Sequence, residues 1–160
     1  MFPTPTAKLP QRFALKDKTI VITGGARGLG LSFATALAEA GANIAAIDLN
    51  DSPPSELDKL QALGVKAKYY AANVQDYDGL RNTIERIAEE FGSIDGWTMR
   101  TAMLKQIFED TPGREQLLNS GSMLKRVGEP DELHGAMLYL MSDASSYMTG
   151  NDILVDGGKL

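Results

Sequence analysis

Residues 19–30 decide the fold of this 160-residue chain, and they read Thr-Ile-Val-Ile-Thr-Gly-Gly-Ala-Arg-Gly-Leu-Gly. The β-branched run over 19–22 predicts a short strand that is buried on both faces. The glycines that follow allow a tight turn, and small and apolar residues then recur at helical spacing over 29–40. Gly41 ends this predicted helix as a C-cap. The stretch therefore predicts a strand, a glycine turn and a helix in direct succession.

The same alternation of strand and helix continues along the chain. The further predicted elements are strands over 43–48, over 66–71 and from 93, and helices over 52–63, with Ser52 as the N-cap, and over 76–91. Such alternation is typical of a parallel sheet with right-handed crossovers. We therefore expect an α/β fold with a Rossmann-like, doubly wound parallel sheet.

The remaining residues are expected to complete one domain. Helical patterns occur over 101–109, 113–119 and 130–141, and an apolar run over 152–155 predicts a last strand. The length suits a single domain. Prolines near the N-terminus predict a flexible tail over 1–12, so the expected dinucleotide-binding domain covers 13–160.

The composition excludes several classes of function. The chain has no cysteine, which excludes disulfides and thiolate chemistry, and its single histidine, His134, argues against a metal site. The net charge of −5 argues against nucleic acid or an anionic membrane as a partner, because both favour a basic face. No run approaches the roughly 20 apolar residues of a membrane span, and no secretory signal is present. We therefore expect a cytoplasmic protein.

The glycine turn predicts a site for the phosphates of a nucleotide. Residues without a Cβ let backbone amides and the helix N-terminus approach a pyrophosphate, and the expected contacts are Gly24, Gly28, Leu29 and Gly30. Asp48 ends the next predicted strand about 20 residues on, where a carboxylate can hold ribose hydroxyls. The alternative is a structural turn without a ligand. A nucleotide kinase is excluded, because no Gly-Lys-Ser/Thr follows the loop.

Asp48 also bears on the choice of cofactor. A carboxylate within about 4 Å of a 2′-phosphate costs roughly 1 to 4 kcal/mol, depending on screening. This repulsion favours NAD over NADP. Arg27 opposes that preference, because a loop arginine could pair with the phosphate; the alternative for Arg27 is a solvated side chain. We expect NAD, with NADP as the weaker ligand.

The spacing Thr-Gly-x-x-x-Gly-x-Gly over 23–30 resembles the short-chain dehydrogenase/reductase family. Other segments resemble family motifs as well: Asn73-Val74, Met99-Arg100-Thr101, the run R-V-G-E-P-D-E-L over 126–133, and the C-terminal stretches 142–150 and 155–158. The resemblance extends from about residue 13 to residue 158. It implies an oxidoreductase that binds a nicotinamide dinucleotide and acts on a small ketone or alcohol, with sugars or polyols as candidates. Members of the family are usually dimers or tetramers.

The resemblance also assigns roles to single residues. Asp48 would contact the adenosine ribose, Leu49 would belong to the cofactor-binding residues, and Thr101 would contact the nicotinamide carboxamide. Asn73 and Val74 would flank the adenine ring, although the family usually has an aspartate at the first of these positions.

The catalytic residues of the family are missing from the sequence. That family uses a tyrosine as general acid/base, a lysine four residues later and a serine that steadies the carbonyl oxygen. The residues four positions after the five tyrosines are Asn73, Val74, Arg81, Asp143 and Asn151. None of these is lysine, so we expect no catalytic residues of the family pattern.

The position of the missing segment can be predicted. The chain runs from the fourth predicted strand through 96–98 directly into the family's late motif at 99–101, which predicts an internal deletion near 96–98. The family's sheet order is 3-2-1-4-5-6-7, and loss of strands five and six suggests the shortened order 3-2-1-4-7, with 152–155 beside the fourth strand. The expected protein is catalytically inactive. Alternatives are an active carbonyl reductase with a different site, a non-catalytic module that pairs with a full-length relative, and an unstable product.

Overall fold

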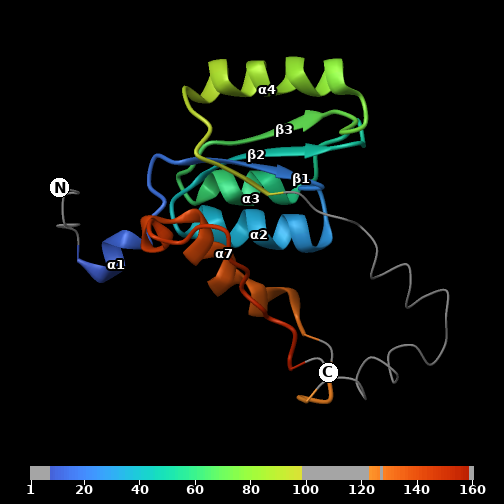
Figure 1. Cartoon of the computed structure of the whole chain (residues 1–160). Helices are drawn as coiled ribbons and strands as arrows, with labels where there is room; N and C mark the ends of the chain where they lie inside the picture. Colours follow the sequence, from blue (N-terminus) through green and yellow to red (C-terminus); the bar gives the residue numbers. More distant parts are fainter. Residues whose placement is uncertain (1–7, 99–122, 127, 159–160) are drawn as a thin grey trace.

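The framework of the protein is a parallel sheet with helices on both faces (Figure 1). The computed structural model describes residues 8–98, 123–126 and 128–158. Its elements are α1 (Leu9–Arg12), β1 (Thr19–Thr23), α2 (Gly28–Glu39), β2 (Asn43–Asp48), α3 (Glu56–Ala62), β3 (Ala67–Ala71), α4 (Tyr77–Phe91), β4 (Gly96–Thr98), η1 (Pro130–Leu133), α7 (His134–Met141) and η2 (Asp143–Ser145). The strands pair in parallel in the order β3-β2-β1-β4. The expected α/β, Rossmann-like fold class is confirmed.

The two faces of the sheet have separate cores. All of β1 is buried, and side chains of successive residues point to opposite faces. Ile20 and Ile22 belong to the face that α2, α3 and α7 cover, whereas Val21 belongs to the face that α4 covers. This double coverage explains why β1 and β2 read as continuous apolar runs.

Helix α4 agrees with the prediction from the sequence. Asp76 is its N-cap, and the Asp76 carboxylate accepts a hydrogen bond from the backbone amide of Gly79 at 3.2 Å. The buried Ile87 anchors the helix on the sheet. Gly92 ends it with φ +86°, in the left-handed region that favours glycine. The local signals of this helix therefore suffice to place it.

The predicted start of α3 is wrong. The helix begins at Glu56, with Ser55 and not Ser52 as the residue before it. A helix capped by Ser52 would need helical backbone angles at Pro53, which precedes Pro54, and a residue before proline is disfavoured in the helical region because its backbone collides with the proline ring. Consecutive prolines at 53 and 54 therefore delay the helix.

The predicted last strand is also wrong, and with it the order 3-2-1-4-7. Residues 152–155 form no strand and pair with none of the described strands. In Figure 1 this segment, drawn in red, extends beyond α7 and away from the sheet. The backbone amides of Met123 and Leu124 instead donate to the carbonyls of Gly158 and Gly157, at 3.1 and 3.2 Å. β4 is described over Gly96–Thr98, where it pairs with β1.

The N-terminal part of the described chain is tied to the C-terminal part. Within the expected tail, α1 is a single helical turn. The guanidinium of Arg12 donates to the backbone carbonyl of Asp143 at 3.3 Å, and Lys18 Nζ lies 2.5 Å from the Asp143 carboxylate. The division into a tail over 1–12 and a domain over 13–160 stays a prediction, and the predicted helices over 101–109 and 113–119 lie outside the described residues.

An ion pair joins the segment 123–126 to η1. The two terminal nitrogens of Arg126 each donate to one oxygen of the Glu132 carboxylate at 2.6 Å. The backbone amide of Glu129 donates to the same carboxylate at 2.8 Å. The bonds from Arg126, and then that from Glu129, lower the pKa of Glu132 to about 2.

Stability should therefore depend on Glu132 in a defined pH interval. The folded-state pKa lies below the ordinary value of 4.5, so the contribution is complete above pH 4.5 and is lost as the pH falls toward 2. The difference in urea midpoint between the wild type and Glu132→Gln should shrink over this interval. Asp131→Asn, a change at the exposed neighbouring residue, is the control. A Glu132 difference that does not vary with pH would contradict the prediction.

Candidate functional site

The candidate site lies where β1 ends and α2 begins. Gly24 and Gly28 have φ of +67° and +50°, in the left-handed region that favours glycine. Gly30 allows a close approach, because a Cβ there would lie 2.2 Å from the carbonyl oxygen of Gly24. Three of the predicted glycines are thus required by the backbone itself.

The first turn of α2 supplies hydrogen-bond donors to this loop. Arg27 is the N-cap, and the first backbone bond of the helix runs from the amide of Leu31 to the carbonyl of Arg27 at 3.3 Å. The amides of the first residues of a helix have no acceptor within it and lie at the positive end of the helix dipole. The amides of Gly28, Leu29 and Gly30 occupy these positions, so they can bind an anionic group such as a phosphate.

Gly25 is a further residue that the loop requires, and the sequence analysis overlooked it. A Cβ on Gly25 would lie 2.9 Å from both the Cβ of Ala46 and the carbonyl oxygen of Ile22. Its amide also donates to the carbonyl of Ile47 at 3.2 Å. The loop therefore lies directly on β2. The adjacent pair of glycines in the sequence was the signal that could have predicted this contact.

Asp48 lies beside the glycine loop, as the sequence predicts for a ribose-binding carboxylate. One oxygen of the half-buried Asp48 carboxylate accepts from the backbone amide of Ala26 at 3.1 Å, and the other accepts from the amide of Leu49 at 2.8 Å. Each carboxylate oxygen has more than one lone pair, so both can accept further bonds from ribose hydroxyls. The two amide bonds fix the orientation of the side chain.

The end of β3 reaches the same edge of the sheet. The backbone amide of Ala72 donates to the carbonyl of Asp48 at 2.9 Å, which brings the segment with Asn73 and Val74 next to the end of β2. The side-chain carbonyl of Asn73 accepts from the amide of Gln75 at 3.0 Å, in the turn before α4. Val74 is exposed, as an adenine-contacting side chain must be in the free protein. Their contact with adenine stays a prediction.

The structure says less about the other three predicted site residues. Leu49 follows Asp48 and is 67% exposed. Arg27 has an extended backbone and an exposed side chain directly before α2, and its pairing with a 2′-phosphate stays a prediction. Thr101 lies outside the described residues.

Tyr69 lies close to Asp48, although the sequence analysis gave it no role in the site. Its hydroxyl donates to the backbone carbonyl of Asn50, two residues after Asp48. Desolvation by burial, and then the carboxylates of Asp48 and Asp51, raise the pKa of Tyr69. Side chains alternate along a strand, so the pair Tyr69-Tyr70 places one ring on each face, and this alternation was the signal in the sequence.

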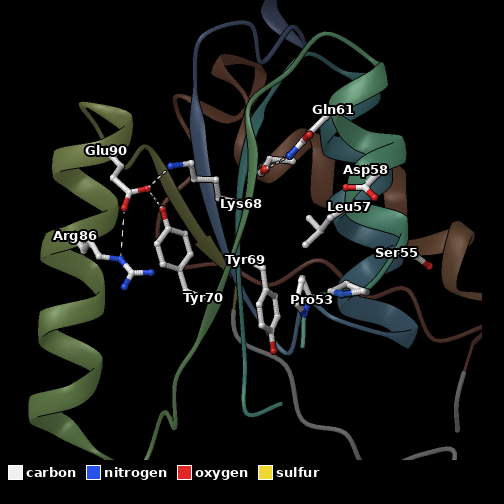
Figure 2. Close-up of a pocket in the computed structure, with 12 residues that line it drawn as sticks. Pro53, Ser55, Leu57, Asp58, Gln61, Lys68, Tyr69, Tyr70, Arg86 and Glu90 are labelled. Carbon is white, nitrogen blue, oxygen red and sulfur yellow. Dashed lines mark hydrogen bonds and ion pairs between the residues drawn. The ribbon is translucent and has the colours of Figure 1, made fainter. Parts of the chain in front are cut away.

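A groove of about 440 Å³ runs along β3 between α3 and α4 (Figure 2). The Glu90 carboxylate at its border accepts from the Tyr70 hydroxyl and from Lys68 Nζ, both at 2.8 Å, and it lies 3.5 Å from Arg86 Nε. Burial and the bond to Glu90 raise the pKa of Tyr70, while Lys68 and Tyr70 lower that of Glu90. No residue of the glycine loop lines the groove. We therefore assign the Glu90 cluster a structural role, in holding α4 against β3.

Three further observations on the described part of the chain concern metal binding, the single histidine and membrane-spanning helices. No group of three or more histidine, aspartate or glutamate side chains is placed there to hold a metal ion. His134 Nε2 lies 2.7 Å from the hydroxyl of Ser32, so this histidine links α7 to α2. Among the described helices, none combines the length and apolar character needed to cross a membrane.

Comparison with known families gives matches along most of the chain. The family model described as short chain dehydrogenase matches residues 18–112, and the model described as enoyl-(acyl carrier protein) reductase matches residues 97–159. The first of these covers the glycine loop, Asp48 and all four strands.

Individual relatives agree with these matches. The chain is 25% identical to a probable NADP-dependent mannitol dehydrogenase of Yarrowia lipolytica in an alignment of 261 positions, which covers 98% of this chain and 94% of the relative. It is 37% identical over 99 residues to a sorbose reductase of Candida albicans, which covers 58% of this chain and 35% of that relative. Because the chain has only 160 residues, a large part of the mannitol dehydrogenase has no counterpart in it.

A solved structure shows the same fold. An NADPH-dependent 3-quinuclidinone reductase from Rhodotorula rubra is 21% identical, with a TM-score of 0.84 over 99% of this chain and 97% of that one. At this identity the likeness concerns the fold, and it agrees with the helix-covered parallel sheet described above.

Proposed function

The chain belongs to the short-chain dehydrogenase/reductase family, and from this premise we propose that it binds a nicotinamide dinucleotide, NAD in preference to NADP, without transferring hydride by the family's mechanism. The relatives are named for mannitol and sorbose, which makes a polyol or sugar the substrate class of its ancestry.

The observation that carries binding is the pairing of the glycine loop with Asp48. The Ala26 amide donates to the Asp48 carboxylate, so the phosphate-binding amides and the sugar-binding carboxylate are held next to each other. A Cβ at Gly30 would lie 2.2 Å from the carbonyl oxygen of Gly24, so the first turn of α2 packs directly on the loop and its amides are held beside it. Gly28, Leu29 and Gly30 would hold the pyrophosphate, and Asp48 would hold the adenosine ribose. When bound, the cofactor would supply hydride-transfer chemistry.

The proposed preference for NAD rests on charge. The Asp48 carboxylate would repel a 2′-phosphate, at a cost of roughly 1 to 4 kcal/mol. The Yarrowia relative is named for NADP, so both cofactors have to be compared. Asp48 is half-buried, and its charge is therefore screened less by solvent than that of an exposed side chain.

The proposed inactivity rests on the missing proton donor. A general acid/base must lie within hydrogen-bond reach of the reacting oxygen and have a suitable pKa. None of the five tyrosines has a lysine four residues later. Tyr69 and Tyr70 have raised pKa values, which is the opposite of the activation that a general base needs.

We expect NADH to bind saturably and to remain unoxidised. Fluorescence titration of the purified chain with NADH and NADPH measures binding, and absorbance of NADH in the presence of fructose or sorbose measures turnover. Saturable NADH binding, weaker NADPH binding and a constant absorbance are the expected results. Turnover above the rate without protein would refute the inactivity, and the absence of a saturable response to either cofactor would refute the binding.

A further inference from the structure

We infer that Tyr69 is a positioning residue for the dinucleotide site: its hydroxyl holds the loop over 49–51, and this contact sharpens the discrimination between NAD and NADP. The inference rests on the proposed function. Tyr69 belongs to the edge strand of the sheet, and its hydroxyl bonds to the loop after Asp48, so its effect would be exerted through Asp48.

The position of Tyr69 follows from the register of β2 and β3. Tyr69 pairs with Ala46, and Asp48 pairs with Ala71, so the tyrosine lies two residues before the end of the sheet. Its side chain extends past that end, and the hydroxyl donates to the carbonyl of Asn50. Figure 2 shows the ring beside Pro53, on the opposite side of the strand from Tyr70. The tyrosine thus connects β3 to the loop that follows Asp48.

The loop needs such a connection because its own side chains contribute little packing. Leu49, Asn50 and Asp51 are all exposed, whereas the Tyr69 ring packs against the core under α2 and α3. Exposed segments with few apolar contacts have low local stability. A hydrogen bond from a packed side chain therefore restricts the loop.

The hydroxyl of Tyr69 remains a donor at neutral pH. Burial and the nearby carboxylates of Asp48 and Asp51 disfavour the phenolate and raise the pKa of Tyr69 above its ordinary value of 10.0. The carbonyl of Asn50 can only accept. The bond is therefore maintained throughout the pH range in which the cofactor would bind.

A chain of short contacts leads from Tyr69 to the carboxylate. Tyr69 fixes the carbonyl of Asn50, the preceding residue Leu49 donates its amide to one oxygen of Asp48 at 2.8 Å, and the other oxygen accepts from Ala26. A loop that moves freely would release the Leu49 amide and allow the carboxylate to turn. Asp48 would then bind the ribose hydroxyls less tightly. Its carboxylate could also rotate away from a 2′-phosphate, which would weaken the discrimination against NADP.

The test compares two substitutions at neighbouring residues, each of which removes one hydroxyl group. Tyr69→Phe removes the hydroxyl and keeps the ring, and Tyr70→Phe removes a hydroxyl that faces Glu90 on the other side of the strand. We expect Tyr69→Phe to weaken NADH binding about 3- to 10-fold, as for the loss of one hydrogen bond, with a smaller change for NADPH. Tyr70→Phe should leave both dissociation constants unchanged. A purely structural role for Tyr69 would weaken the two cofactors equally.

Amide hydrogen exchange without cofactor provides a second, independent readout. Tyr69→Phe should accelerate exchange in residues 49–51, and Tyr70→Phe should not. Unchanged exchange in Tyr69→Phe overturns the inference, whether or not the chain binds a cofactor. If the wild type binds NADH and Tyr69→Phe alters neither affinity nor the NADH:NADPH ratio, the inference fails and the proposed function stands. If the wild type binds neither cofactor, the proposed function fails, and with it the role of Tyr69 in cofactor choice.

Discussion

Gly30→Ala is expected to lower the free energy of unfolding substantially and to abolish the binding of NADH. The added Cβ would lie 2.2 Å from the carbonyl oxygen of Gly24 and 2.8 Å from its carbonyl carbon. Both are backbone atoms, which cannot rotate out of the way as a side chain would. Extra atoms in a packed site typically cost about 1 to 3 kcal/mol, and occasionally more. Relief requires the first turn of α2 to move away from the loop, and this movement removes the amides of Leu29 and Gly30 from the phosphate site.

Gly135→Ala is the matched control for this substitution. Gly135 lies within α7, and among the described residues a Cβ there would meet no atom within 4 Å beyond its chain neighbours and the backbone of its own helix. Alanine favours a helix over glycine by up to about 1 kcal/mol, so this variant should be as stable as the wild type or slightly more stable. Urea unfolding and NADH titration of both variants provide the measurement. A Gly30→Ala protein with an unchanged midpoint would contradict the close contact between α2 and the loop.

The elements that the sequence predicted correctly are those with local signals. Helix α4 has an N-cap in Asp76, an apolar stripe and a glycine at its end, and all of these are readable from the residues themselves. β1 and β2 are apolar runs directly before and after the glycine-helix unit. Their parallel pairing follows because a helix between two strands favours a right-handed crossover. The core of the site, which is the glycine loop beside Asp48, is a consequence of this one βαβ unit.

The predictions from the sequence are wrong where the structure depends on residues that are distant in the chain. Residues 152–155 have the composition of a strand, yet composition does not determine which edge a strand will meet. In the structure Leu154 is 82% exposed, and the backbone next to this run bonds with Met123 and Leu124. The prediction of Ser52 as the N-cap is wrong for a local reason, because the effect of Pro54 on the backbone of Pro53 was overlooked.

Tyr69 is a residue whose role requires the register between two strands. The sequence shows two tyrosines near the end of a predicted strand, and alternation alone places them on opposite faces. Only the pairing of Tyr69 with Ala46 places its hydroxyl beyond the end of β2, within reach of Asn50. The proposed support for Asp48 therefore comes from a strand that follows it by about 20 residues, and such supporting hydrogen bonds are what orient a binding side chain.

Asp48→Asn is expected to reverse the preference between the two cofactors. The carboxylate would accept charge-assisted bonds from ribose hydroxyls, each worth about 1.5 to 3 kcal/mol. Loss of the charge should therefore weaken NADH binding by about 10- to 100-fold. The same change removes the repulsion of a 2′-phosphate, so NADPH binding should improve or stay constant. Asparagine retains one carbonyl oxygen for the amide of Ala26 or Leu49, and the fold should persist.

The discriminating measurement is the ratio of the NADH and NADPH dissociation constants. Glu39→Gln removes the same formal charge from an exposed residue at the far end of α2 from the glycine loop, so it controls for a change in net charge. Its cofactor ratio should equal that of the wild type, whereas the ratio of Asp48→Asn should invert. If both cofactors weaken equally in Asp48→Asn, the carboxylate serves only to hold the Ala26 and Leu49 amides. The preference for NAD would then have to arise from another residue, because pairing of Arg27 with the 2′-phosphate would favour NADP.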